Sequence, residues 1–127
     1  MNKGHIYFEI QTDDPKRAIG FYSQVFSWTF SEIPGLPIPY WTIETGGSRG
    51  GLLKRPGATP PPGSGTNAYV CSLEVEDFDV TAKVIVDRGG IVALPKFAVP
   101  KTCWQGYFVD PEGNTFGIFQ VDPKAGT

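Results

Sequence analysis

Histidine and cysteine are scarce in this sequence. Among 127 residues there is one histidine, His5, and there are two cysteines, Cys71 and Cys103. Two cysteines cannot form a disulfide framework, so both are expected to be reduced thiols, at least one of them in the core. With a single histidine near the chain start, neither a Ser-His-Asp nor a Cys-His arrangement is predicted.

The sequence also lacks a concentrated positive charge and a long apolar run. The net charge is -2, and lysine and arginine are scattered along the chain. Phosphate backbones are bound through a dense basic surface, so nucleic acid is not an expected partner. No segment approaches 20 apolar residues, and the start does not resemble a secretory signal. We therefore expect a soluble, cytoplasmic protein that does not bind a membrane.

What the sequence does contain begins with an alternating strand. In the segment HIYFEIQ, apolar residues alternate with polar ones, which is typical of a half-buried strand. Asp14 is suited to cap a helix and Pro15 to begin one, so a helix is predicted at about residues 15–27. Its apolar face would consist of Ala18, Ile19, Tyr22, Val25 and Phe26.

The second half repeats this arrangement. Another alternating segment starts near residue 70 and leads to Asp77, which lies 63 residues after Asp14 and is predicted to cap a second helix. Gly89 is expected to end that helix in the left-handed conformation. The buried stripe of the second helix would be Phe78, Ala82 and Ile85. Beyond the helices, equivalent residues of the two halves lie 66 positions apart in the sequence.

These signals predict one domain, residues 1–127, built from two modules. The first module covers about residues 4–54 and the second about 68–121. Residues 55–67, rich in proline and glycine, are predicted to be the linker. After each helix the sequence predicts strands broken by turns, with a hairpin tip at residues 110–114.

The chain resembles the vicinal oxygen chelate superfamily, which includes glyoxalase I, bleomycin-resistance proteins and extradiol dioxygenases. The segments TDDPKRAIGFYSQVFSW, GGSRGGLLKRP and YFVDPEGNTFGIFQ carry the resemblance, which extends from about residue 4 to 121. It implies an α+β fold in which two βαβββ modules form a curled mixed sheet, an open cup with helices outside and the ligand inside. It also implies a homodimer.

In metal-dependent relatives, four positions that face the cup hold histidine or glutamate. The resemblance places Tyr7, Gly51, Val70 and Gly117 at these positions, and only tyrosine among them has a donor group. Divalent transition metals require three or four ligands, so no metal site and no cofactor are expected. A non-standard site formed by His5, Glu9 and Glu74 is the alternative.

The function predicted from the sequence is therefore the binding of a small organic molecule without a metal, with the ligand unknown. The alternative is an enzyme, a glyoxalase-like lyase or isomerase with a non-standard site, in which Glu9 or Glu74 is the candidate catalytic base. A third possibility is a structural partner with a vestigial cup. The expected ligand-binding residues are Tyr7, Glu9, Gln11, Trp41, Ser72, Glu74 and Trp104.

Overall fold

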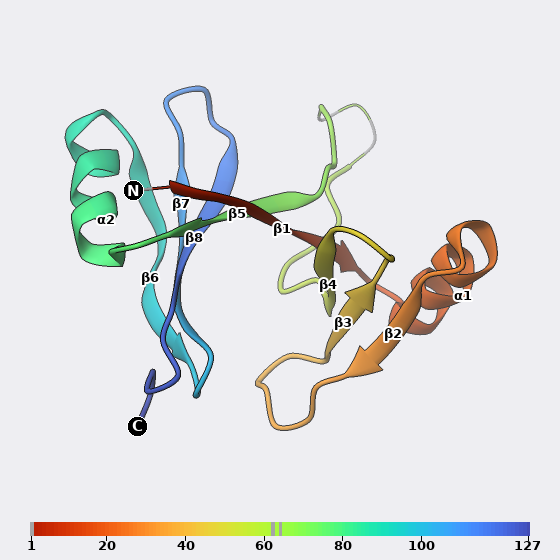
Figure 1. Cartoon of the computed structure of the whole chain (residues 1–127). Coiled ribbons are helices and arrows are strands. Elements are labelled where there is room, and N and C mark those ends of the chain that lie inside the picture. The colour runs from red at the N-terminus through yellow and green to blue at the C-terminus, as the bar shows by residue number, and fades with distance from the viewer. Residues whose placement is uncertain (1, 62, 64) are drawn as a thin grey trace. The chain divides into compact units, whose positions relative to one another are not determined.

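The computed structural model describes residues 2–61, 63 and 65–127. Two residues of the predicted linker, 62 and 64, therefore lie outside the described residues. The elements follow the order β1, α1, β2, β3, β4 and then β5, α2, β6, β7, β8, which confirms two βαβββ modules and the α+β class (Figure 1). Their bounds are Asn2–Thr12, Pro15–Phe26, Thr29–Glu32, Tyr40–Glu44 and Arg49–Lys54 in the first module, and Val70–Val75, Phe78–Asp87, Ile91–Val99, Cys103–Val109 and Thr115–Val121 in the second.

The chain forms two compact units. The first unit is Tyr7–Tyr69, and the second unit comprises the residues up to Ile6 together with Val70–Thr127. Strand β1 therefore contributes its beginning to the second unit and the rest to the first. In the first unit the strand order is β2-β3-β4-β1, and in the second it is β5-β8-β7-β6.

The two modules have the same strand pairing. β1 runs parallel to β4, and β5 runs parallel to β8, while the other pairs of each module are antiparallel. The register is also repeated, because Glu9 pairs with Gly51 just as Ser72 pairs with Gly117. Equivalent residues of the two modules can thus be compared one by one.

Both helices begin where the sequence predicts. Asp14 accepts a hydrogen bond from the Arg17 backbone N–H at 3.1 Å, and Asp77 accepts one from Val80 at 3.0 Å. These carboxylates satisfy N–H groups that have no partner within the helix. Gly89 follows the second helix with a φ of +99°, as predicted. At 12 and 10 residues, the helices of the described chain are too short to span a membrane.

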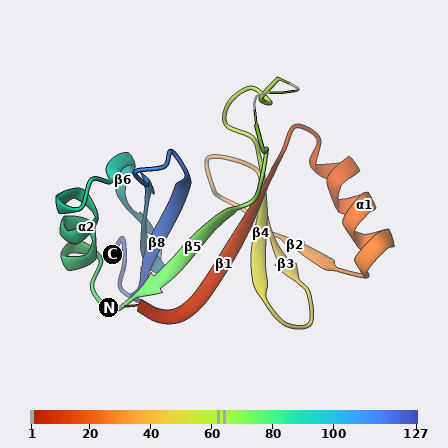
Figure 2. The same cartoon turned by 90° about the horizontal axis from the view of Figure 1, so that it is seen from above.

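Each helix covers one face of its own strands (Figure 2). In the first unit the helix packs against a core of Ile10, Ile43 and Leu52, and in the second Phe78 lies in a core with Val75, Phe108 and Ile118. The predicted stripe of the first helix is partly wrong. Ala18, Ile19 and Tyr22 pack on the core, but Val25 and Phe26, in the last turn of the helix, are 54% and 55% exposed and do not pack on that core.

The hairpin tip predicted at residues 110–114 is present. Asp110 accepts hydrogen bonds from the backbone N–H groups of Glu112 and Asn114, both at 2.9 Å, and Gly113 has a φ of +84°. The bond from Asn114 is the main cause that lowers the pKa of the Asp110 carboxyl. Turn chemistry therefore fixes the connection between β7 and β8.

Candidate functional site

In the first unit, Gly51 leaves room for the phenol of Tyr40. A Cβ at Gly51 would overlap the Tyr40 hydroxyl and would lie 2.8 Å from the Tyr7 hydroxyl. A glycine inside a strand often marks such a close approach. Because side chains alternate along a strand, these two tyrosines lie on the sheet face opposite the one covered by α1.

The Tyr40 hydroxyl connects Tyr7 to Glu9. It donates a hydrogen bond to Glu9 Oε2 at 3.0 Å and lies 2.7 Å from the Tyr7 hydroxyl. A phenol has one proton, so once Tyr40 donates to the carboxylate, Tyr7 has to donate to Tyr40. The resulting chain runs from Tyr7 through Tyr40 to Glu9, and it ends on a carboxylate, which accepts hydrogen bonds.

Tyr40 remains protonated in this position. Burial raises the pKa of the Tyr40 phenol far above its usual value, and the neighbouring charge of Glu9 raises it further. The phenol therefore acts as a hydrogen-bond donor over the whole physiological pH range.

Gln11, the third polar residue expected on this strand, has a structural contact through its backbone. Arg55 Nη2 donates to the Gln11 carbonyl at 3.1 Å, and Arg55 Nε lies 3.5 Å from an Asp13 carboxylate oxygen. The Arg55 side chain is only 12% exposed. Arg55 thus holds the segment after β4 against the end of β1.

The second unit has an equivalent arrangement around Gly117. A Cβ at Gly117 would overlap Ser72 Oγ and would lie 2.7 Å from Gln105 Nε2. Gln105 Nε2 donates to Ser72 Oγ at 3.1 Å and to the Gly106 carbonyl at 3.3 Å. Ser72 and Gln105 are 1% and 9% exposed. A neutral amide and hydroxyl therefore occupy the place that the phenol and carboxylate occupy in the first unit.

Glu74 and His5 form a pair elsewhere in the second unit. His5 Nδ1 lies 2.7 Å from Glu74 Oε1, and their side chains are 77% and 12% exposed. Glu9 belongs to the first unit. Among the described residues there is no group of three or more His, Cys, Asp or Glu side chains that is placed to hold a metal ion.

The two tryptophans expected to bind a ligand lie on the helix side of their strands. Trp41 packs against the core of the first unit and Trp104 against that of the second. Trp104 Nε1 also donates to Asp122 at 3.0 Å. Neither shares a strand face with Tyr40 or Gln105, because alternate residues of a strand point to opposite sides.

Two residues outside the expected set, Tyr40 and Gln105, turn out to be central to these polar groups. The signal that could have found them is the pair of glycines, Gly51 and Gly117, in the middle of strands. Such glycines predict that a side chain from a neighbouring strand lies over them.

The comparisons with known proteins agree with this fold. The sequence model of the Glyoxalase/Bleomycin resistance protein/Dioxygenase superfamily matches residues 4–118. The chain belongs to this superfamily. Within the superfamily, it is 26% identical over 128 residues to a protein of Mycobacterium bovis whose name assigns it provisionally as the glyoxylase CFP32. That match covers 94% of the chain but 46% of the relative, so the chain spans about half the length of this relative.

Solved structures of other proteins show the same superfamily fold. A hypothetical protein of Bacillus halodurans superposes with a TM-score of 0.70 at 13% identity, covering 95% of this chain and 96% of that one. A methylmalonyl-CoA epimerase of Streptomyces coelicolor gives a TM-score of 0.68 at 13% identity, with both chains covered completely. At these identities the likeness concerns the fold alone.

The four residues that the resemblance aligns with metal-ligand positions do not form a metal-binding donor set. The space at Gly51 is filled by the tyrosine hydroxyls, and the space at Gly117 is filled by Ser72 and Gln105. Val70 has no donor atom in its side chain, and Tyr7 is already hydrogen-bonded to Tyr40. Three or four N, O or S ligands are needed around a divalent transition ion. This donor set does not supply them.

Proposed function

We propose that this chain binds a small organic molecule without a metal, and that the Tyr7–Tyr40–Glu9 group recognises it. The observation that supports this most directly is the Tyr40 hydroxyl above Gly51, bonded to both Tyr7 and Glu9. The resemblance aligns this glycine with a metal-ligand position of metal-dependent relatives. Here a phenol and a carboxylate offer hydrogen-bonding chemistry in its place.

The protons of this group define the class of ligand. Tyr7 and Tyr40 each donate their hydroxyl proton in a hydrogen bond within the chain. The Glu9 carboxylate accepts hydrogen bonds through several lone pairs. A ligand has to supply the hydrogens, as an ammonium, hydroxyl or amide group does. An ammonium group adds charge–charge attraction to its hydrogen bond with the Glu9 carboxylate, so a ligand with an ammonium group is favoured.

A thermal-shift screen of small metabolites and planar antibiotics at millimolar concentration tests the proposal. Donor-bearing compounds are expected to raise the melting temperature, and Glu9→Gln is expected to abolish that shift. Glu44→Gln is the matched control, because it removes one carboxylate from the exposed end of β3. If no compound stabilises the protein, or if both variants lose the shift equally, the proposal fails.

Metal analysis and an activity assay distinguish this binding function from the alternative, an enzyme. Purified protein is examined for stoichiometric transition metal, then supplied with nickel, zinc, iron or manganese and assayed for hemithioacetal isomerisation. The proposal expects neither metal uptake nor turnover. A stoichiometric metal ion or measurable isomerisation would instead support a glyoxalase-like lyase or isomerase.

The assembly and location of the protein are further proposals. We propose a cytoplasmic homodimer, on the basis of the superfamily membership. Size-exclusion chromatography with light scattering measures the mass in solution. A particle of 13.8 kDa, the mass of a single chain, would exclude the dimer.

A further inference from the structure

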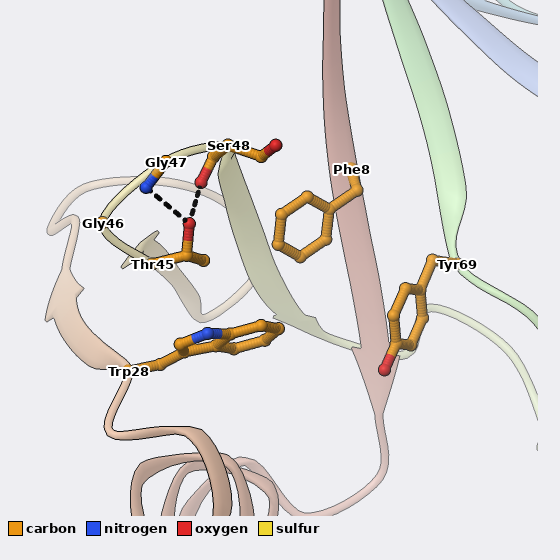
Figure 3. Close-up of a pocket in the computed structure, with 7 residues that line it drawn as sticks. All are labelled: Phe8, Trp28, Thr45, Gly46, Gly47, Ser48 and Tyr69. Atoms are coloured by element: carbon orange, nitrogen blue, oxygen red, sulfur yellow. Dashed lines mark hydrogen bonds between the residues drawn. The ribbon is translucent and has the colours of Figure 1, made fainter.

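The first unit contains a pocket on the opposite face of β1 from Tyr7 and Glu9, a cavity that is open to solvent rather than enclosed. Phe8 lies between these two residues in sequence and points to the other side of the strand. The cavity has a volume of about 530 Å³, within the range of small-molecule pockets. It is lined by Phe8, Trp28, Thr45, Gly46, Gly47, Ser48 and Tyr69 (Figure 3).

Aromatic rings form two sides of this cavity, and other rings hold them in place. Trp28 stacks on Tyr22 with ring centroids 5.2 Å apart and an interplanar angle of 8°. The Phe8 ring lies 5.8 Å from Trp28 and 6.0 Å from Tyr69. The Tyr69 hydroxyl is tied to that of Tyr22 at 2.6 Å. The rings are therefore preorganised before any ligand arrives, which lowers the entropic cost of binding.

The third side is the turn between β3 and β4. Thr45 Oγ1 donates to the Ser48 carbonyl and accepts from the Gly47 N–H at 3.2 Å, as Figure 3 shows. Gly46 has a φ of +87°, which favours glycine. Small residues in this turn leave the space beside Trp28 open.

In the first module the Phe8 ring lies over Gly50, and the second module fills the equivalent pair of positions differently. Phe8 pairs with Gly50 in the first module, and Cys71 pairs with Phe116 at the equivalent positions of the second. Phe116 stacks on Phe108 with ring centroids 5.9 Å apart and packs against the core of the second unit. A large residue thus occupies the position that is glycine in the first module.

We propose that this cavity binds an uncharged planar aromatic ring, stacked on Trp28. The rings supply flat apolar walls, and the turn supplies hydroxyl and peptide groups for one polar edge of a ligand. None of the seven lining residues is an Asp, Glu, Lys, Arg or His, so the cavity offers no charge to pair with an ion. This site is separate from the Tyr7–Tyr40–Glu9 group and does not depend on it.

Titration with indole, followed by NMR of the tryptophan side-chain N–H signals, tests the proposal. The chain has three tryptophans, and only Trp28 lines the cavity. Indole is expected to shift the Trp28 signal more than those of Trp41 and Trp104, with a Kd on the order of 1 mM for a fragment of this size. No saturable shift, or a shift centred on another tryptophan, would overturn the proposal.

A pair of glycine variants provides the control for folding. Gly47 and Gly57 both have open space where a side chain would begin and no left-handed φ, but only Gly47 lines the cavity. Gly47→Phe is expected to weaken indole binding roughly tenfold, and Gly57→Phe is expected to leave it unchanged. Equal binding by the two variants would contradict the assignment.

Two other probes test the ligand class. Cyclohexanol is uncharged but not planar, and tetramethylammonium is a cation that aromatic rings can attract. Both are expected to bind more weakly than indole. If cyclohexanol binds as well, planarity is not recognised, and if tetramethylammonium binds better, the cavity is a cation site; either result rejects the proposal.

Discussion

The first and second units fill the same glycine position with different chemistry. Above Gly51 lies a phenol bonded to a carboxylate, and above Gly117 lie a hydroxyl and an amide. The strand register around the two glycines is the same. Both modules therefore have a space above the glycine of their last strand. The side chains that fill this space decide whether the polar group there is charged, as in the first unit, or neutral, as in the second.

The largest expected effect comes from filling these spaces. Gly51→Ala places a methyl group against the rigid Tyr40 ring and is expected to destabilise the protein by about 3 kcal/mol. Gly117→Ala meets the polar ends of Ser72 and Gln105, with the Tyr107 ring at 3.1 Å, and is expected to cost about 1 kcal/mol because a serine or glutamine side chain can turn aside more easily than the Tyr40 ring. Urea unfolding measures both. Equal losses would show that the rigidity of the neighbour does not matter.

Removing the polar partners is expected to have the next largest effect. Tyr40→Phe removes the phenol that donates to the Glu9 carboxylate and is expected to cost about 2 kcal/mol. Gln105→Leu removes a neutral bond to Ser72 and is expected to cost about 1 kcal/mol. A double-mutant cycle of Tyr40→Phe with Glu9→Gln isolates the charged hydrogen bond. Zero coupling in that cycle would contradict the geometry.

The pH dependence of stability should distinguish the units at alkaline pH. The pKa of Tyr40 is raised in the folded state, so its contribution is complete below pH of about 10. At higher pH the unfolded chain loses this proton first, and stability falls by up to about 1.4 kcal/mol per pH unit. Tyr40→Phe is expected to show a shallower decline than the wild type in urea unfolding. Parallel declines would show that Tyr40 is not the group responsible.

The smallest effect is expected at His5. This side chain is 77% exposed although it pairs with Glu74, and exposed ion pairs contribute little. His5→Ala is expected to change the free energy of unfolding by less than about 0.5 kcal/mol. A loss as large as that of Tyr40→Phe would contradict the expectation that this exposed pair contributes little to stability.

Much of the fold could be predicted because its signals are local. Asp14 and Asp77 cap their helices through bonds to residues three positions on, and the 110–114 turn is built from its own side chains. Tyr7 and Glu9 were expected on one strand face from alternation alone, and the structure brings them together through Tyr40. These contacts either lie within a few residues or follow from the period of a strand.

The sequence by itself determined the order of elements and the repeat, because those features depend on residue type and spacing. Only the tertiary structure decided that Tyr40 lies over Gly51, that Trp41 and Trp104 pack on the helix side, and that Phe8 and Trp28 border a cavity. These facts depend on the register between strands that are distant in sequence. That register is set by side-chain packing across the whole sheet, which no local pattern encodes.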